Sequence, residues 1–162
     1  MKRFHFPLFL ILVVCLGGAA NAAREDHPVI VQLISARTGA ALNIQAEAAI
    51  TPKEVELGLM NRADVPEGTG MLFRFDPPRV VTFWMKNTLV PLDMLFIRAD
   101  GQIAKIAART TPLDLSPISS GEPVATVLEI RGGEAQRLQI NVGDKAVFPG
   151  LTKDNAPALN LP

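Results

Sequence analysis

Cysteine and histidine are almost absent from this chain of 162 residues. Its one cysteine is Cys15, and its two histidines are His5 and His27. A structural zinc site needs four ligands, usually thiolates and imidazoles, and a Ser–His–Asp triad or Cys–His dyad needs a histidine beside its nucleophile. His27 is expected in an exposed N-terminal leader, where chain ends are often poorly ordered. The sequence therefore predicts no metal site, and it leaves carboxylates, lysine, arginine, serine and threonine for any catalysis.

An excess of positive charge is also missing. Sixteen basic residues balance sixteen acidic ones, so the formal net charge is zero. Nucleic-acid binding usually depends on a basic patch, and nucleotide binding on a glycine-rich loop of the G-x-G-x-x-G or G-x-x-x-x-G-K-[ST] type. Neither loop pattern occurs in the sequence. No nucleic-acid partner is expected.

Apart from Cys15, methionine is the one soft ligand in the sequence. Thioethers suit Cu(I), but methionine more commonly fills irregular gaps in a hydrophobic core. The methionines show no M-x-x-M cluster. Core packing is therefore the favoured interpretation, and no cofactor is expected. The residues concerned are Met60, Met71, Met85 and Met94.

The N-terminus has the layout of a secretory signal peptide. Lys2 and Arg3 precede an apolar run, residues 6–16, which is far shorter than the roughly 20 residues that a membrane-spanning helix needs. Ala20-Asn21-Ala22 places small residues where a signal peptidase cleaves. We predict that residues 1–22 are removed, that the protein is periplasmic or extracellular, and that no membrane span remains. The alternative is an uncleaved N-terminal anchor.

Residues 23–148 are expected to form a single β-rich domain, followed by a flexible tail over residues 149–162. Many short apolar runs separated by turn residues are typical of a compact antiparallel β-sandwich or barrel-like domain. One short helix is predicted from Pro52 to about Asn61, because Thr51 and Glu54 form a capping box around it. The predicted strands cover residues 29–33, 42–50, 71–75, 79–85, 92–97, 102–107, 124–130 and part of 139–148.

Two turn signals define these strands further. Asp76-Pro77-Pro78 is expected to end a strand, because proline cannot donate a hydrogen bond to a sheet. Asp100-Gly101 lies between two apolar runs and predicts an antiparallel hairpin.

The run FWMKNTLVPLDMLFI, residues 83–97, is similar to the characteristic motif of a known family. It resembles the signature of the domain-of-unknown-function 192 family, with supporting pieces in the expected order: Gly58-Leu59-Met60-x-Arg62, Gly70-Met71-Leu72-Phe73, Leu128-Glu129 and Gly143-Asp144. The resemblance implies a compact β-sandwich-like domain with a short helix. It implies no activity.

The same run also contains the candidate site. Strand alternation places Trp84 and Lys86 on one face, and a bend then brings further polar side chains beside the indole. Such a group can form a polar pocket with an aromatic wall for a small polar ligand. The candidate ligand-binding residues are Arg62, Trp84, Lys86, Asn87, Thr88, Asp93 and Glu129.

A structural interpretation of these residues stays open. Asp93 could pair with Lys86 or Arg62, while Asn87 and Thr88 satisfy backbone groups of the turn. Three functions follow. The first is a binding module for a small polar ligand, and the second is an accessory protein that binds a protein partner and has no pocket. The third is a hydrolase or lyase that uses Asp93 or Glu129 as a base.

Overall fold

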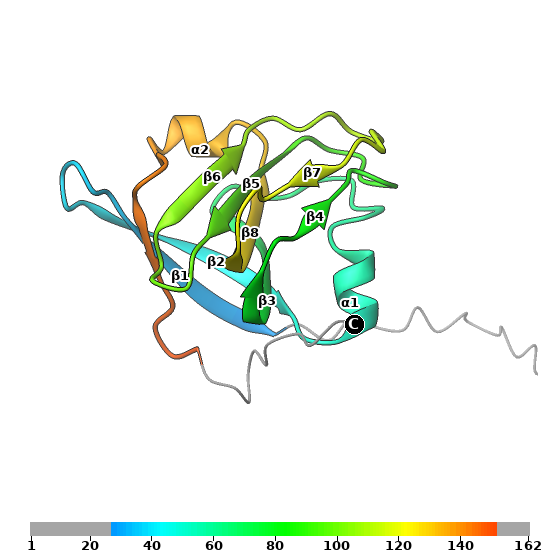
Figure 1. The fold of residues 1–162 in the computed structure, drawn as a ribbon. Helices are drawn as coiled ribbons and strands as arrows, with labels where there is room; N and C mark the ends of the chain where they lie inside the picture. Colours follow the sequence, from blue (N-terminus) through cyan, green and yellow to red (C-terminus); the bar gives the residue numbers. More distant parts are fainter. Residues whose placement is uncertain (1–26, 152–162) are drawn as a thin grey trace, which may run out of the picture.

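The computed structural model describes residues 27–151, in which one curled sheet of seven strands dominates (Figure 1). The strand order is β6-β5-β8-β3-β2-β1-β9, and β4 and β7 form a separate two-stranded sheet. The strands are β1 (Pro28–Ile34), β2 (Ala41–Ala49), β3 (Thr69–Arg79), β4 (Thr82–Phe83), β5 (Leu92–Ile97), β6 (Ile103–Ala107), β7 (Ile118–Ser119), β8 (Val124–Arg131) and β9 (Lys145–Val147). The helices are α1 (Pro52–Leu57) and α2 (Glu134–Arg137).

The mainly β prediction is confirmed, and the hairpin at Asp100-Gly101 is confirmed by the antiparallel pairing of β5 with β6. The topology adds two features. β2 and β3 run parallel, since α1 carries the chain between them, whereas every other strand pair is antiparallel in this part of the chain. A second short helix, α2, follows β8.

The expected strand end at Asp76-Pro77-Pro78 is wrong, because β3 continues to Arg79. The ladder between β3 and β8 is interrupted between Arg74 and Arg79, so the prolines lie where the sheet needs no N–H donor. The strand predicted over residues 79–85 shrinks to the two residues of β4, which pair only with β7.

Helix α1 begins as predicted. The Thr51 hydroxyl accepts a hydrogen bond from the Glu54 N–H, and the Glu54 carboxylate accepts one from the Thr51 N–H. The helix ends earlier than predicted, because Gly58 adopts a positive φ of 48° and its N–H returns to the Glu54 carbonyl. The chain then turns back toward the sheet, so the short helix can form one wall of a cavity.

Replacing Thr51 with alanine is expected to lower the free energy of unfolding by about 1 kcal/mol, because the Glu54 N–H loses its acceptor. Urea denaturation measures the change. Thr51→Ser is the matched control, since it keeps the hydroxyl and is expected to stay near wild type. Equal stability of the alanine and serine variants would contradict the role of the cap.

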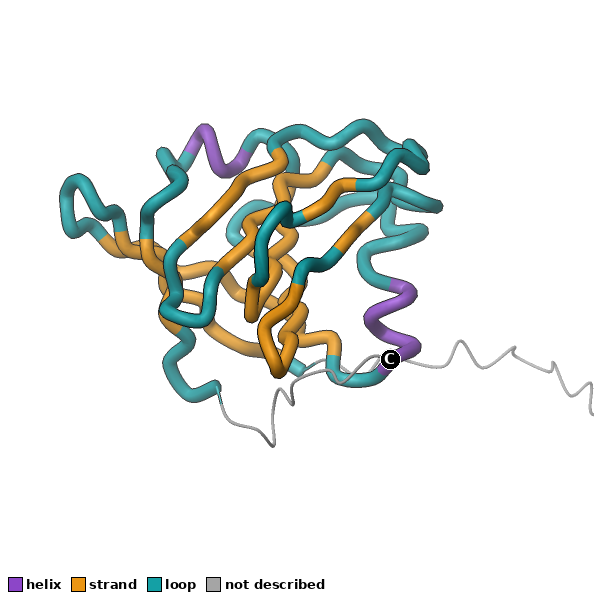
Figure 2. Tube along the Cα trace, viewed as in Figure 1, coloured by secondary structure: helices purple, strands orange, loops and turns teal. Residues whose placement is uncertain are grey.

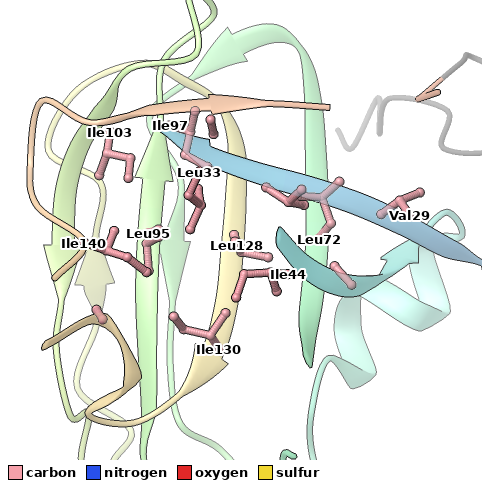
Figure 3. Packing of buried hydrophobic residues seen from close by; sticks show 14 of the residues in the cluster. Val29, Leu33, Ile44, Leu72, Leu95, Ile97, Ile103, Leu128, Ile130 and Ile140 are labelled. Atoms are coloured by element: carbon pink, nitrogen blue, oxygen red, sulfur yellow. The ribbon is translucent and has the colours of Figure 1, made fainter. Parts of the chain in front are cut away.

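Both faces of the curled sheet are buried. On β8, Leu128 and Ile130 point into a first apolar cluster (Figure 3), whereas Val127 belongs to a second one on the opposite face. Phe83 of β4 and Ile118 of β7 pack against the second cluster. The small sheet therefore covers the second face. The segments that join β4 to β5 and β6 to β7 are loop throughout (Figure 2).

The ends of the described chain are anchored. His27 was expected to be exposed, and this is wrong: it is half-buried, with Nε2 lying 3.8 Å from Oε1 of Glu54. Leu151, in the predicted tail, packs against the first cluster. The predicted signal peptide, residues 1–22, lies outside the described residues, as do residues 152–162. Within residues 27–151, no helix has the length and apolar character needed to cross a membrane.

Candidate functional site

A cavity of about 410 Å³ opens on the second face of the sheet. Its walls come from α1, the end of β3, β4 with the residues that follow it, and β8. Most of the lining side chains are apolar, and four of them are aromatic. Small-molecule sites in proteins typically combine such apolar walls with a few polar groups. The lining residues are Val55, Glu56, Leu57, Gly58, Leu59, Met60, Phe73, Phe75, Arg79, Val80, Val81, Thr82, Phe83, Trp84, Thr88 and Glu129.

Glu129 is the one acid in the interior of this cavity. It lies in the middle of β8, between Met71 of β3 and Met94 of β5, and only 4% of its surface is exposed. No residue among 27–151 pairs with its carboxyl group. Burial raises the pKa of Glu129 to about 8. The carboxyl group is therefore mostly protonated at neutral pH and is open to a partner from outside the fold.

Trp84 forms part of the cavity mouth. Its side chain is 48% exposed, and Nζ of Lys86 lies 5.0 Å from the centroid of its ring, a cation–π geometry. Thr88 is buried in the lining, where its hydroxyl donates a hydrogen bond to the Lys86 carbonyl at 3.2 Å. Of the predicted site residues, Trp84, Thr88 and Glu129 thus line one cavity, and Lys86 lies on the indole beside it.

Asp93 lies elsewhere. It is fully buried, and Oδ1 accepts hydrogen bonds from the backbone N–H groups of Arg109 at 2.7 Å and Gly133 at 2.9 Å. Oδ2 accepts a third, from the N–H of Ala135 at 2.8 Å. The carboxylate therefore fastens the end of β6 and the start of α2 to β5. It pairs with neither Lys86 nor Arg62, and it does not line the cavity.

Two further predicted residues stabilise local structure. Arg62 forms a bidentate ion pair with Glu47, with Nη1 lying 2.7 Å from Oε1. Asn87 adopts a positive φ of 53°, and its carbonyl accepts a hydrogen bond from the N–H of Asn61. Arg62 therefore pairs with Glu47 and not with Asp93 as the structural interpretation suggested, and Asn87 makes its contact through its backbone carbonyl.

Sequence reasoning missed the aromatic wall. Phe73 and Phe75 alternate on β3 and therefore share a face, which was a usable signal. Phe83 completes this wall, with its ring centroid 5.2 Å from that of Phe73 in an edge-to-face arrangement. At the rim, the Arg79 guanidinium lies 5.4 Å from the centroid of the Phe75 ring, and α1 contributes the exposed Glu56. Sequence spacing alone does not bring α1 to the edge of β3.

Few polar side chains line the cavity. Besides Glu129, its interior offers the hydroxyl of Thr88, while Glu56 and Arg79 lie at the rim. No group of three His, Cys, Asp or Glu side chains suited to a metal ion occurs within residues 27–151. The arrangement is suited to surrounding an apolar molecule and contacting one polar group of it.

The fold and the cavity define a small mainly β domain with a buried acid in an apolar pocket. The chain belongs to the DUF192 family, described as uncharacterised ACR, whose sequence profile matches residues 33–148. The predicted family is thus confirmed over more than half of the chain. No curated protein matches the chain significantly.

Two solved structures are similar over most of the domain. A protein of Sinorhizobium meliloti 1021, described as a "putative transcription regulator (R01717)", is 41% identical with a TM-score of 0.75. The match covers 79% of this chain and 98% of that one. A protein of unknown function from Novosphingobium aromaticivorans DSM 12444 is 39% identical with a TM-score of 0.70, covering 74% of this chain and 84% of that one.

Proposed function

We propose that this chain is an exported binding protein that holds a small, mostly apolar molecule in the cavity beside Trp84. The observation that carries the proposal is Glu129, a buried carboxyl group that lines the cavity and has no partner among residues 27–151. Burial against apolar walls disfavours the charged form of this carboxyl group, a desolvation cost that an apolar residue at this position would avoid. A ligand that completes the hydrogen bonding of Glu129 accounts for this cost.

The cavity walls change the class of ligand that we expect. The sequence suggested a polar molecule, but the walls are formed mainly by phenylalanine and aliphatic side chains. We therefore favour a molecule with an apolar body and one polar group. An accessory protein without a pocket explains neither the cavity nor the buried acid, and the balanced charge gives no support to nucleic acid.

Catalysis is the second candidate, because a carboxyl group with a pKa of about 8 is suited to general acid–base chemistry near neutral pH. The residues around it favour binding. Asp93 is committed to three backbone N–H groups, and the buried hydroxyl of the lining, that of Thr88, is bonded to a carbonyl. Binding therefore ranks first.

The single tryptophan supplies the experiment. Trp84 is the only tryptophan and tyrosine is absent, so selectively excited emission comes from the cavity mouth alone. Titrating a library of small apolar alcohols, amides, amines and acids is expected to change this emission for at least one compound. The same compound should raise the melting temperature by mass action.

Val55→Phe tests whether the binding occurs in the cavity. Val55 lies on α1 in the lining, and a larger side chain there is expected to weaken binding at least tenfold by occupying the space. Val142→Phe is the matched control, because Val142 is exposed and outside this cavity. The proposal fails if no compound changes both signals, or if Val55→Phe and Val142→Phe bind alike while both remain folded. Leu57→Phe serves the same purpose if Val55→Phe does not fold.

A further inference from the structure

We infer that the ligand is an organic cation, an ammonium group on an apolar body, and that its positive charge lies against the carboxyl group of Glu129. This inference rests on the proposed function and names the chemical class of the ligand. It starts from the distribution of charge around the cavity.

Three ionisable side chains line the cavity in the described part of the chain. Glu56 contributes a negative charge from α1, and Arg79 contributes a positive one from the end of β3. Both lie at the rim, where water screens their opposite charges. Glu129 is left as the one acid without a counter-charge, deep in the apolar interior. A cationic ligand would supply the positive charge that is missing beside Glu129.

The elements packed around Glu129 bring no other charge into the cavity. Its neighbours on β3 and β5 are Met71 and Met94, and the segment after β4 contributes Trp84 and Thr88. Lys86 lies over the Trp84 ring and does not line the cavity. An anionic ligand would therefore meet only the rim guanidinium of Arg79, and it would have to approach an acid.

The aromatic walls favour the same ligand class. The faces of aromatic rings carry partial negative charge and attract cations, more strongly where water is excluded. Trp84 and Phe75 already attract Lys86 and Arg79 of the protein itself. The rings of Phe73 and Phe83 line the interior, where no cation of the described chain reaches them.

Binding of a cation has a signature that a neutral ligand lacks. Glu129 is mostly protonated at pH 7, so it must release its proton to the solvent when an ammonium group binds beside it. Close to one proton per ligand is expected at pH 7. The apparent affinity should fall about tenfold for each pH unit below 8, because a smaller fraction of Glu129 is ionised.

Three probes with one skeleton test the inference: 2-phenylethylammonium, 2-phenylethanol and 3-phenylpropanoate, each with longer-chain homologues. Titration calorimetry in buffers of different ionisation enthalpy gives the affinity and the protons released, and Trp84 emission reports occupancy. At pH 8 the ammonium is expected to bind at least tenfold more tightly than the alcohol, and the carboxylate most weakly. Glu129→Gln keeps the size of the side chain, and it should abolish both the proton release and the preference for the ammonium.

The possible outcomes separate the two proposals. Tighter binding of the ammonium with proton release that depends on Glu129 supports both. Equal or tighter binding of the alcohol or the carboxylate overturns the cation inference, and the proposed function then stands on the neutral or anionic ligand. Binding of the ammonium that is unchanged in Glu129→Gln also overturns the inference. If none of the three series binds, the inference fails. The proposed function is then tested by the wider compound library described above and by the binding of its hits to the Val55→Phe variant.

Discussion

Asp93→Ala is expected to lower the free energy of unfolding by about 3 kcal/mol or more, because three backbone N–H groups, one buried and two partly buried, would lose their acceptor at about 1–3 kcal/mol each. The groups belong to Arg109, Gly133 and Ala135. Total stabilities of domains are about 5–15 kcal/mol, so this variant approaches unfolding at the low end of that range. Urea denaturation followed by circular dichroism measures the loss.

Alanine variants of two other acidic residues test whether the loss of stability follows the number of hydrogen bonds that the carboxylate accepts. Asp144 is also buried but accepts from two backbone N–H groups, of Ala36 and Asn141, so Asp144→Ala is expected to cost less than Asp93→Ala. Asp64 is exposed and pairs with Arg131, so Asp64→Ala is expected to cost less than about 1 kcal/mol. A loss for Asp93→Ala no larger than that for Asp64→Ala would contradict the structural role of Asp93.

Asp93→Asn separates stability from binding. It keeps one acceptor oxygen and is expected to be less destabilised than the alanine variant. Since Asp93 does not line the cavity, the asparagine variant should bind cavity ligands with the affinity of the wild type, as long as it is folded. Specific loss of binding would restore Asp93 to the ligand site that the sequence suggested.

The position of Asp93 shows which kind of contact cannot be predicted from the sequence. Its side chain was expected to pair with Lys86 or Arg62, because opposite charges are visible in a sequence. Its actual partners are backbone N–H groups, which every residue except proline has. They come from the segment after β6 and from the start of α2, 16 to 42 residues farther along the chain. No residue type marks them, so only the folded chain reveals the contact.

Local signals were more reliable. The capping box at Thr51 and the hairpin at Asp100-Gly101 depend on residues a few positions apart, and both are confirmed. Glu129 was named as a candidate site residue, and alternation along β8 places it on the opposite face from Leu128 and Ile130. The site around it was predicted to be a polar pocket. This face of the sheet is instead apolar and covered by β4, β7 and α1, which no short-range pattern indicates.

The burial of Glu129 leads to the second large effect: Glu129→Gln is expected to stabilise the protein progressively as the pH rises. In the folded wild type the pKa of Glu129 is about 8, against an ordinary value of 4.5. Between these two values the folded chain keeps a proton that the unfolded chain has released. The free energy of unfolding therefore falls with rising pH by about 1.4 kcal/mol per unit, and this fall ends near pH 8. Glutamine is neutral throughout and removes the slope.

Urea denaturation at pH 5, 7 and 9 tests this expectation through the difference in stability between variant and wild type. The difference should grow by a few kcal/mol from pH 5 to pH 9, whatever constant offset the glutamine amide introduces. Glu56→Gln is the matched control, because Glu56 is exposed on the rim of the same cavity, and its difference should not vary over this range. If the Glu129→Gln difference is also independent of pH, the Glu129 carboxyl group is solvated or paired in solution. The buried acid would then support neither the proposed function nor a cationic ligand.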